Sequence, residues 1–377
     1  MNQQTRATEN DRILIRRCLD LARQAEGRTS PNPLVGSVIV REGEIVGEGF
    51  HPGAGQPHAE VFALRQAGEK ARGATLYVNL EPCNHHGRTP PCTEAILQAG
   101  IAKVVIGTID PNPLVAGRGI RRLQEAGIET VVGIEEEECA RLNEGFFHRV
   151  RFRKPFGILK YAMTLDGKIA TTSGHSSWIT HPESRAIVHK LRATCDAVIV
   201  GGNTVRQDDP ELTTHGRSDR NPVRVVMSRS LDLPLQARLW ETIEAHTIVY
   251  TQDIPNVKLQ QQLLKKEIEV IELPSLTPSA VMADLYDRGF CKVLWECGGI
   301  LAARAIAEGT VQKIMAFIAP KIIGGMNAPG PVGDLGLDLM TRALMLENVN
   351  VRYLDPDILI EGYLASDNNA FVAEAPI

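Results

Sequence analysis

A short set of metal-binding side chains constrains the first half of this chain more than any other feature. The run His-Ala-Glu at 58–60 is followed, after a strand-like segment, by Cys83 and then by Cys92. One imidazole and two thiolates suit a tetrahedral zinc ion and leave its fourth position open for water. We therefore predict His58, Cys83 and Cys92 as metal ligands. Glu60 is not needed as a ligand, so we predict that it carries protons for that water as the catalytic residue.

The order of these residues resembles that of zinc deaminases, in which a zinc-activated water attacks an amino-bearing ring carbon. The spacing departs from the deaminase signature, because eight residues, 84–91, separate the two cysteines instead of two. The alternatives are a closed structural zinc site or buried free cysteines. A closed site would require a fourth protein ligand.

The residues around these side chains predict the elements that would bring them together. Residues 74–80 are predicted to form a strand, and residues 93–100 a helix closed by a glycine. Cys92 would then lie at a helix N-terminus, where the helix dipole favours the thiolate. Another helix is expected from His58 to about residue 72, so that two helix starts and one strand end can converge on one metal.

Composition argues against several classes of protein. A chain of 377 residues exceeds a comfortable single core, so two domains are expected. A net charge of −4 without a long basic block argues against polynucleotide binding, and no apolar run is long enough to span a bilayer. Residues 1–12 lack the apolar core of a signal peptide, and seven scattered cysteines are typical of reduced thiols, so a cytoplasmic location is expected. We predict a small-molecule substrate, no nucleic-acid or membrane partner, and a homo-oligomer.

The order of predicted elements in the first half indicates a mixed sheet with helices on both faces. The expected elements are a helix at 11–26, a hairpin at 35–50, strands at 75–80 and 103–108, and helices at 93–99 and 119–126. Four glutamates at 135–138 are interpreted as the solvated first turn of a helix, without chemistry.

The second half alternates strand and helix from residue 156 onward, which predicts another α/β domain with a mostly parallel sheet. The expected strands are 156–163, 196–201, 223–228, 246–251, 268–273, 292–296 and 312–319, and the expected helices are 182–194, 257–267, 278–288 and 300–308. The basic segment 149–155 ends in proline and is taken as the boundary, which gives domains 1–150 and 151–377.

Two glycine pairs suggest a second site. No G-x-G-x-x-G motif follows a strand, so an ordinary Rossmann dinucleotide site is not expected. Gly201-Gly202 and Gly298-Gly299 each follow a predicted strand, where backbone amides can approach a phosphate closely. Plain strand-to-helix turns are the alternative for both pairs.

Longer motifs spread over nearly the whole chain resemble one family. In the first half they are P-N-P-L-V-G at 31–36, H-A-E at 58–60, E-P-C-N-H-H-G-R-T-P-P-C at 81–92 and D-P-N-P-L-V-A-G-R-G at 110–119. In the second half they are L-K-Y-A-M-T-L-D-G-K-I-A at 159–170, W-I-T at 178–180, G-G-N-T-V at 201–205, D-D-P at 208–210 and E-C-G-G at 296–299. The family they resemble is the bifunctional diaminohydroxyphosphoribosylaminopyrimidine deaminase / 5-amino-6-(5-phosphoribosylamino)uracil reductase of riboflavin biosynthesis.

This resemblance implies a fold and an activity for each half. It implies a cytidine-deaminase-like αβα domain followed by a dihydrofolate-reductase-like α/β domain that uses NADPH. The implied reactions are zinc-dependent hydrolytic deamination of 2,5-diamino-6-(5-phosphoribosylamino)pyrimidin-4-one, then reduction of the ribosyl side chain to ribityl.

The same resemblance assigns candidate binding residues by motif. Residues expected to hold the deaminase substrate are Asn32, His51 and Arg88, with Asp110 and Asn112 as further candidates. Residues expected to face the reductase substrate are Ser176, Arg192, Leu212, His215 and Glu296. Residues expected to face NADPH are Ala162, Trp178, Thr204, Asp208, Ser228, Gly298, Gly299, Ile300, Leu301, Ala302, Ala303 and Arg304. Structural alternatives exist, since Glu296 could cap the following helix and Trp178 could be a core aromatic.

One position departs from the family pattern. The family often has an arginine two residues after the threonine of its L-T segment, where this chain has His215. A phosphate contact made by a histidine would depend on pH, because histidine titrates near neutrality while arginine stays charged. Arg217 is the alternative source of a fixed charge.

Two functions of other classes remain open at this stage. One is a single-activity nucleoside or RNA-base deaminase with an accessory domain, which the acidic balance disfavours. The other is a zinc-stabilised binding protein without catalysis, which the spare Glu60 disfavours.

Overall fold

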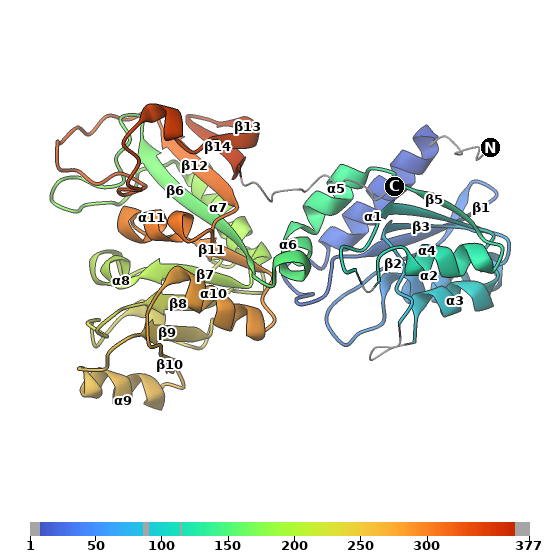
Figure 1. Cartoon of the computed structure of the whole chain (residues 1–377), viewed down its shortest axis with the longest axis horizontal. Helices are drawn as coiled ribbons and strands as arrows, with labels where there is room; N and C mark the ends of the chain where they lie inside the picture. Colours follow the sequence, from blue (N-terminus) through green and yellow to red (C-terminus); the bar gives the residue numbers. More distant parts are fainter. Residues whose placement is uncertain (1–7, 86–89, 114, 366–377) are drawn as a thin grey trace. The chain divides into compact units, whose positions relative to one another are not determined.

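The chain folds into two compact units. The computed structural model describes residues 8–85, 90–113 and 115–365, and contacts within it divide the chain after Arg153 (Figure 1). The division falls at the end of α6 (Glu144–Phe152), which occupies part of the basic segment taken as the boundary. Phe147 on this helix is buried against Leu80 and Ala140, which explains why the basic segment is helical. Among the described helices, none has the length and apolar character needed to cross a bilayer.

The first unit contains a mixed sheet, as predicted, with five strands in the order β2-β1-β3-β4-β5. β1 is antiparallel to β2 and β3, whereas β3, β4 and β5 are parallel. β5 was not predicted, because it is only four residues long and none of them is fully buried. The other elements are α1 (Glu9–Arg23), β1 (Gly36–Arg41), β2 (Glu44–Phe50), α2 (Ala59–Ala67), a 3-10 turn (Gly68–Ala71), β3 (Thr75–Leu80), α3 (Cys92–Ala99), β4 (Lys103–Thr108), α4 (Arg118–Glu125), β5 (Glu129–Val132) and α5 (Glu136–Leu142).

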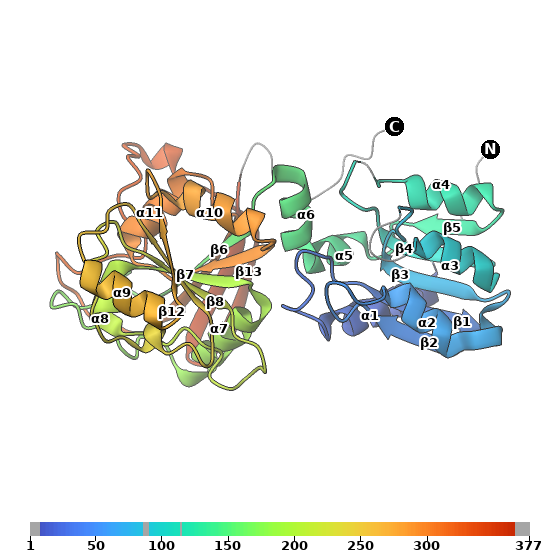
Figure 2. The same cartoon turned by 90° about the horizontal axis from the view of Figure 1, so that it is seen from below.

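Helices cover both faces of this sheet because successive strand residues point to opposite sides. Leu76 and Val104 pack with the apolar residues of α2, α3 and α4. Tyr77 and Val105 pack with those of α1 and α5. The layers are visible in two orthogonal views (Figures 1 and 2).

Glycines on β2 let α2 lie directly against the sheet. A Cβ added at Gly47 would lie 2.2 Å from the carbonyl oxygen of Ala63, and one at Gly49 would lie 2.7 Å from that of Ala59. A side chain at either position would push the helix outward. The close contact fixes the start of α2, which carries His58 and Glu60.

The second unit contains a nine-stranded sheet in the order β10-β9-β8-β7-β11-β6-β12-β14-β13. Its elements are β6 (Phe156–Thr164), α7 (Pro182–Thr194), β7 (Ala197–Gly201), α8 (Gly202–Asp208), β8 (Val223–Met227), a 3-10 turn (Arg238–Trp240), β9 (Thr247–Thr251), α9 (Val257–Lys265), β10 (Glu269–Glu272), α10 (Pro278–Asp287), β11 (Lys292–Trp295), α11 (Gly299–Ala307), β12 (Lys313–Ala319), a 3-10 turn (Met340–Arg342), β13 (Leu346–Leu354) and β14 (Asp357–Leu364). The seven predicted strands are parallel, as expected, and the antiparallel β13–β14 hairpin and α8 were missed.

The strand order indicates at which edge of this sheet a ligand would bind. The chain moves from β6 to β7 and onward to β10, then returns through β11 to β12, so the direction reverses at the central strands β7, β11 and β6. Helices α10 and α11 pack their apolar residues on one face, and α7 lies on the other (Figure 2). Ligands in open α/β sheets bind beyond the carboxyl ends of strands at such a reversal.

A buried carboxylate on the unpredicted hairpin holds α7 in place. Asp357, at the start of β14, is 1% exposed. Its Oδ2 accepts hydrogen bonds from the backbone N–H of His181 (2.7 Å) and the hydroxyl of Ser184 (2.6 Å). These donors belong to the N-terminus of α7, which offers no side-chain cap of its own. The hairpin therefore sets the position of the helix that carries Arg192.

We predict that Asp357→Ala lowers the free energy of unfolding of the second unit by about 2 kcal/mol, because the buried hydroxyl of Ser184 and the backbone N–H of His181 lose their acceptor. All three tryptophans of the chain, at 178, 240 and 295, belong to this unit, so fluorescence-detected urea unfolding reports on it. The exposed Asp287→Ala, at the end of α10, is the control and should change little. Equal stabilities for the two variants would contradict the assigned role of Asp357.

Candidate functional site

Three metal-binding side chains converge in the first unit. His58 is the N-cap of α2, Cys92 is the first residue of α3, and Cys83 lies three residues beyond β3. His58 Nδ1 is 3.2 Å from Cys92 Sγ and 3.5 Å from Cys83 Sγ. Their ligand atoms all lie within 4.8 Å of one another, and among the described residues no fourth side chain joins them. The predicted helix start at Cys92 is confirmed.

Hydrogen bonds between the two ends of the intervening loop bring the cysteines together. The backbone N–H of Thr93 donates to the carbonyl of Cys83 (3.2 Å), and its hydroxyl donates to Asn84 Oδ1 (2.9 Å). The backbone N–H of Cys92 lies 3.3 Å from Cys83 Sγ. The eight-residue spacing is therefore closed by contacts at its ends.

The donor set suits a divalent metal. Hydrogen bonds from Cys92 and from His58 lower the pKa of the Cys83 thiol to about 4. The hydrogen bond that Cys92 donates to Cys83 raises the pKa of the Cys92 thiol. One imidazole beside such a pair has the composition of an open zinc site.

Glu60 lies beside these ligands without a hydrogen-bonding partner for one oxygen. It is 3% exposed, and its Oε2 has no partner among the described residues. Burial, reinforced by the negative charge of Cys83, raises the pKa of Glu60 to about 7. A carboxyl group that titrates near neutral pH can both accept and return a proton.

Asn32 and His51 lie next to the metal-binding group. The rings of His51 and His58 meet edge to face with centroids 5.3 Å apart. His51 Nδ1 lies 3.0 Å from the carbonyl of Pro57, which only accepts, so Nδ1 carries the proton. Its Nε2 then accepts from the Asn32 amide at 3.1 Å. These two hydrogen bonds fix the orientation of the Asn32 amide. Arg88, the predicted cation of the loop, lies outside the described residues.

Glu81 is a site residue that the sequence analysis missed. Glu81 is 4% exposed, and its carboxylate accepts from four backbone N–H groups, two in the segment before α4 and two in the first turn of α4. The donors are Asp110 (3.3 Å), Gly117 (3.0 Å), Gly119 (2.9 Å) and Ile120 (3.3 Å). Gly119 must be glycine, because a Cβ there would lie 2.1 Å from the carbonyl oxygen of Pro82. The sequence signal for this role was an acidic residue at the end of a predicted strand, together with a glycine-rich helix start.

Asp110 and Asn112, the further candidates, lie on the segment that Glu81 holds. The backbone N–H of Asn112 donates to Asp110 Oδ1 at 2.8 Å. Burial, with the neighbouring Glu81, raises the pKa of Asp110 to about 6.

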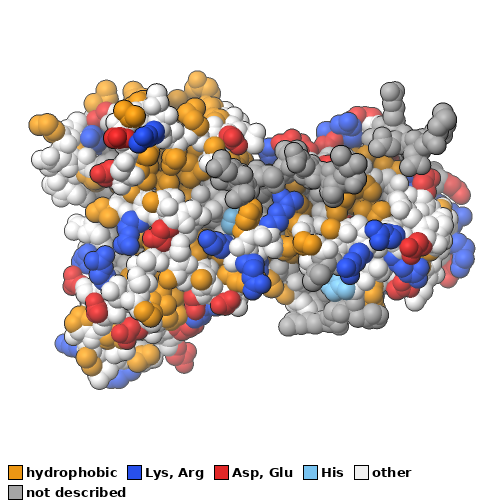
Figure 3. All heavy atoms as spheres, viewed as in Figure 1, with side chains coloured by type: hydrophobic (Ala, Val, Ile, Leu, Met, Phe, Trp, Pro, Cys, Tyr) orange, Lys and Arg blue, Asp and Glu red, His pale blue; other side chains and the backbone are white. Residues whose placement is uncertain are grey.

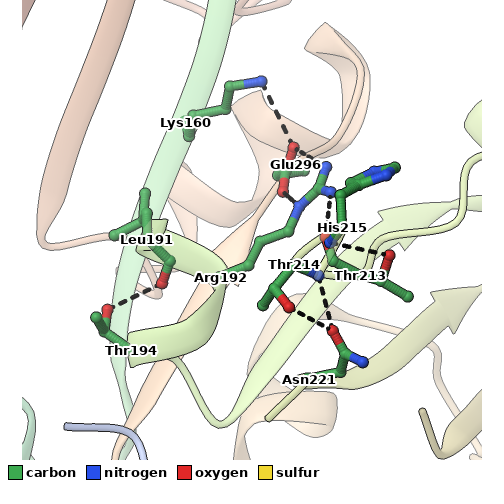
Figure 4. A network of polar contacts seen from close by, with 9 residues as sticks. All are labelled: Lys160, Leu191, Arg192, Thr194, Thr213, Thr214, His215, Asn221 and Glu296. Atoms are coloured by element: carbon green, nitrogen blue, oxygen red, sulfur yellow. Dashed lines mark hydrogen bonds and ion pairs between the residues drawn. The ribbon is translucent and has the colours of Figure 1, made fainter. Parts of the chain in front are cut away.

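In the second unit, Glu296 and Arg192 form a buried bidentate ion pair (Figure 4). Arg192 Nε lies 2.6 Å from Oε1 of Glu296, and Nη2 lies 3.1 Å from Oε2. Lys160 Nζ, on β6, is 3.5 Å from the same carboxylate. Burial alone would raise the pKa of Glu296, but the charges of Arg192 and Lys160 outweigh it and lower the pKa to about 2. Glu296 is therefore an anion, and it does not cap α11, whose start has no side-chain cap.

Arg192 also holds the segment that contains two predicted substrate residues. Its Nη1 donates to the carbonyl of Thr213 at 2.8 Å. Leu212 and His215, on either side, have positive φ values of 57° and 50°, which are unfavourable for residues with a side chain. Glu296 binds both Nε and Nη2 of Arg192. In this structure that pair of donors is therefore not available for a bidentate contact with a phosphate.

The two glycine pairs lie at the same edge of the sheet, since β7 and β11 are neighbours. Gly202 starts α8 and packs beside the buried Ser228, with 3.2 Å between an added Cβ and its hydroxyl. Gly298 caps α11 and faces open space, whereas a Cβ at Gly299 would lie 2.7 Å from the carbonyl oxygen of Gly330. Close packing alone therefore accounts for Gly299, but not for Gly298.

The remaining predicted residues are distributed around this edge. Ser176 and Asp208 are joined by a hydrogen bond between their side chains. Trp178 is 70% exposed and lies under the Arg185 guanidinium at 4.5 Å, so it is not a core aromatic. Ala162 lies on β6, Thr204 on α8, and residues 300–304 on α11; of these, Ile300 and Arg304 are exposed, Leu301 is half-buried, and Ala302 and Ala303 are buried.

Family comparisons cover both units. A profile described as the cytidine and deoxycytidylate deaminase zinc-binding region matches residues 8–108. A profile described as the RibD C-terminal domain matches residues 155–360. The predicted fold class of each half is therefore confirmed.

Whole-length relatives carry both units in the same order. The riboflavin biosynthesis protein RibD of Synechocystis sp. is 61% identical over 360 residues, covering 96% of this chain and 98% of that protein. RibD of Aquifex aeolicus is 45% identical, covering 93% and 98%. The structure of Acinetobacter baumannii RibD superposes with a TM-score of 0.85 at 38% identity, covering 95% and 99%. The Thermotoga maritima diaminohydroxyphosphoribosylaminopyrimidine deaminase/5-amino-6-(5-phosphoribosylamino)uracil reductase superposes at 0.82 with 37% identity, covering 94% and 99%.

We expect Glu81→Gln to loosen the start of α4 and the segment before it, because an amide NH₂ would replace one of the carboxylate oxygens that accept from four backbone N–H groups. The free energy of local opening should fall by about 2 kcal/mol, which hydrogen–deuterium exchange at Gly117 and Gly119 measures. The exposed Glu69→Gln serves as the control. Unchanged exchange at these amides in Glu81→Gln would show that the carboxylate does not hold the segment.

Proposed function

The chain belongs to the RibD family of bifunctional deaminase/reductases of riboflavin biosynthesis, and on this premise we propose how its residues divide the two reactions. Deamination of 2,5-diamino-6-(5-phosphoribosylamino)pyrimidin-4-one belongs to residues 1–150. NADPH-dependent reduction of the ribosyl side chain to ribityl belongs to residues 151–377. The observation that carries the proposal is a three-ligand metal group beside a buried carboxylate, one oxygen of which has no hydrogen-bond partner among the described residues. The match of the second half to the RibD C-terminal domain leaves no support for a mere accessory domain.

His58, Cys83 and Cys92 would hold one zinc ion per chain. The fit rests on the donor set and on the low pKa of the Cys83 thiol, which makes it a ready thiolate. When bound there, zinc lowers the pKa of a coordinated water toward neutrality. The closed-site alternative lacks support, since no fourth protein ligand joins the group among the described residues.

Glu60 would move the protons of the deamination. Its unpartnered Oε2 is the atom that can take a proton from water and return it to the ring nitrogen and to the departing amine. Burial, which raises the pKa of Glu60 to about 7, keeps both protonation states accessible at neutral pH. We therefore infer the proton-transfer role of Glu60 from its burial next to the metal-binding group.

Asn32 and His51 would orient the pyrimidine. His51 donates from Nδ1 to the carbonyl of Pro57 and accepts at Nε2 from the Asn32 amide. The Asn32 carboxamide would therefore meet the pyrimidine in a defined orientation. A carboxamide offers both donor and acceptor to a pyrimidine edge. Arg88 would supply the cation for the substrate phosphate.

The carboxyl edge of the second sheet would hold NADPH. The open N-terminus of α11 at Gly298 and the turn of Gly201-Gly202 present backbone amides at neighbouring strand ends, which suits an anionic cofactor. NADPH supplies a hydride when bound. The residues proposed around it are Ala162, Trp178, Thr204, Asp208, Ser228, Gly298, Gly299, Ile300, Leu301, Ala302, Ala303 and Arg304.

The reductase substrate would be positioned by Ser176, Leu212, His215, and the Arg192–Glu296 pair. As a buried anion, Glu296 can accept hydrogen bonds from substrate hydroxyl or amino groups. Arg192 would act by fixing that carboxylate and the Thr213 backbone in place. The protein's contribution to the reduction is therefore position and charge.

The exposed edge of the second sheet would form a homo-oligomer. β13 is the last strand of the sheet, and Val351 and Tyr353 on it are 52% and 84% exposed. Hydrophobic side chains gather on the surface of the part that carries β13 and β14 (Figure 3). An apolar edge strand pairs readily with a second copy.

We expect Glu60→Ala to keep stoichiometric zinc and to lose ammonia release by at least about 100-fold, because the proton carrier is gone while all three ligands remain. The same variant should oxidise NADPH normally with the deaminated substrate, since the second site is separate. Metal analysis, an ammonia assay and NADPH absorbance measure the three quantities, with the exposed Glu69→Ala as control. Loss of metal or retained ammonia release would refute the role of Glu60, and loss of NADPH oxidation would refute the division of activities.

Tyr353→Glu should weaken self-association, because it introduces a charge into the apolar edge of β13. Light scattering after gel filtration would give a multiple of the chain mass for the wild type and a smaller mass for the variant. Leu264→Glu, on the exposed face of α9, is a matched control. A monomeric wild type, or equal masses for all three proteins, would overturn the proposed interface.

A further inference from the structure

Two imidazole rings lie against each other beside the Arg192–Glu296 pair, and one of them, His189, has no role in the reactions proposed above. The ring centroids of His189 and His215 are 4.3 Å apart, and the rings are tilted by 31°. His189 lies on α7 three residues before Arg192, so both side chains leave the same face of that helix. His215 follows the Thr213 backbone that Arg192 holds (Figure 4).

His189 carries an unpaired polar atom. Its Nδ1 is buried and has no hydrogen-bond partner among the described residues. Buried polar atoms are normally paired, and an exception beside charged groups points to a ligand. Burial, together with the nearby charges of His215, Arg192 and Arg217, lowers the pKa of His189 to about 4. The ring is therefore neutral at pH 7 unless an anion comes near it.

The charged groups around the two rings favour an anion. The charged groups near the two rings are Arg192 on α7 and Arg217 in the segment around His215, whose charges lower the pKa of His189, and the carboxylates of Glu296 after β11 and Glu211 beside His215. Both carboxylates are themselves paired with cations. Glu296 is bound by Arg192 and Lys160, and Glu211, 3.5 Å from His215 Nδ1, is bound by Arg238 at 3.1 Å, so Arg217 adds its charge to carboxylates that are already neutralised. Because Glu296 takes both bidentate positions of Arg192, a second anion must find its donors elsewhere.

We propose that His189 and His215 together recognise the phosphate of the reductase substrate and take up a proton from solvent as it binds. This inference rests on the proposed reductase function, which supplies the phosphorylated substrate. A single imidazole in place of an arginine offers fewer donors and no fixed charge. A second imidazole in contact with it adds a donor and shares the proton. His189 is thus a specificity-determining residue on α7.

Binding then depends on pH in a defined direction. A phosphate dianion stabilises the protonated form of a neighbouring imidazole. Since His189 is neutral in the free protein at pH 7, the complex must gain a proton, and affinity falls as pH rises, by at most about tenfold per pH unit for one proton. The second ionisation of the phosphate, near pH 6, acts in the opposite direction. The dependence must therefore be compared between variants in the same buffers.

The test is the pH dependence of reductase KM and kcat in the full-length enzyme, from about pH 6 to 8.5, with the deaminated substrate. We expect His189→Gln to raise KM by about five- to tenfold near pH 6.5 and to flatten its rise with pH, because glutamine can donate but cannot titrate. His215→Arg should flatten the dependence while keeping a low KM, because its charge is permanent. In both variants kcat should change by less than about twofold. His246→Gln, at the exposed ion pair with Glu269, is the matched control and should behave as the wild type.

A substrate without the phosphate separates recognition from structure. Wild type and His189→Gln should use the dephosphorylated substrate equally well. The inference is overturned if His189→Gln keeps the wild-type dependence of KM on pH, or if it impairs both substrates alike. A wild-type enzyme that fails to oxidise NADPH with either substrate would overturn the reductase function itself, which is a distinguishable result.

Discussion

Burying a carboxylate costs free energy unless donors surround it, and this constraint organises both units of the chain. Glu81 gathers four backbone N–H groups and so fixes the start of α4. Asp196 accepts from the backbone N–H groups of Cys291 and Lys292, and Asp357 accepts from the start of α7. Glu60 is the contrast, because one of its oxygens is left without a donor among the described residues. The carboxylates that hold the fold are satisfied, and the one that lies beside the metal-binding group is not.

Features with a strong local signal were predictable from the sequence. The two helix starts around His58 and Cys92 follow from proline, glycine and apolar periodicity, and the structure confirms them. The β13–β14 hairpin was missed because β13 is exposed along most of its length and shows no buried face to a pattern search. The role of Glu81 was missed because its partners lie 29 to 39 residues away in the sequence.

The second site shows a different limit of prediction. Motif resemblance named Arg192 and Glu296 as substrate-facing residues, but their pairing joins positions 104 residues apart and depends on the order of β7, β11 and β6. Likewise, His189 belongs to no motif, and only the tertiary contact between α7 and the loop of His215 brings it to the site. A buried ion pair is specified by topology, which local sequence does not encode.

A hydrogen bond between Asn84, at the start of the loop that separates the two cysteines, and Thr93, in the first turn of α3, closes that loop. The approach of the two sulfurs is therefore set at the ends of the loop. A substitution at Asn84 or Thr93 would act on the metal-binding group through the spacing of its sulfurs, although neither residue supplies a ligand.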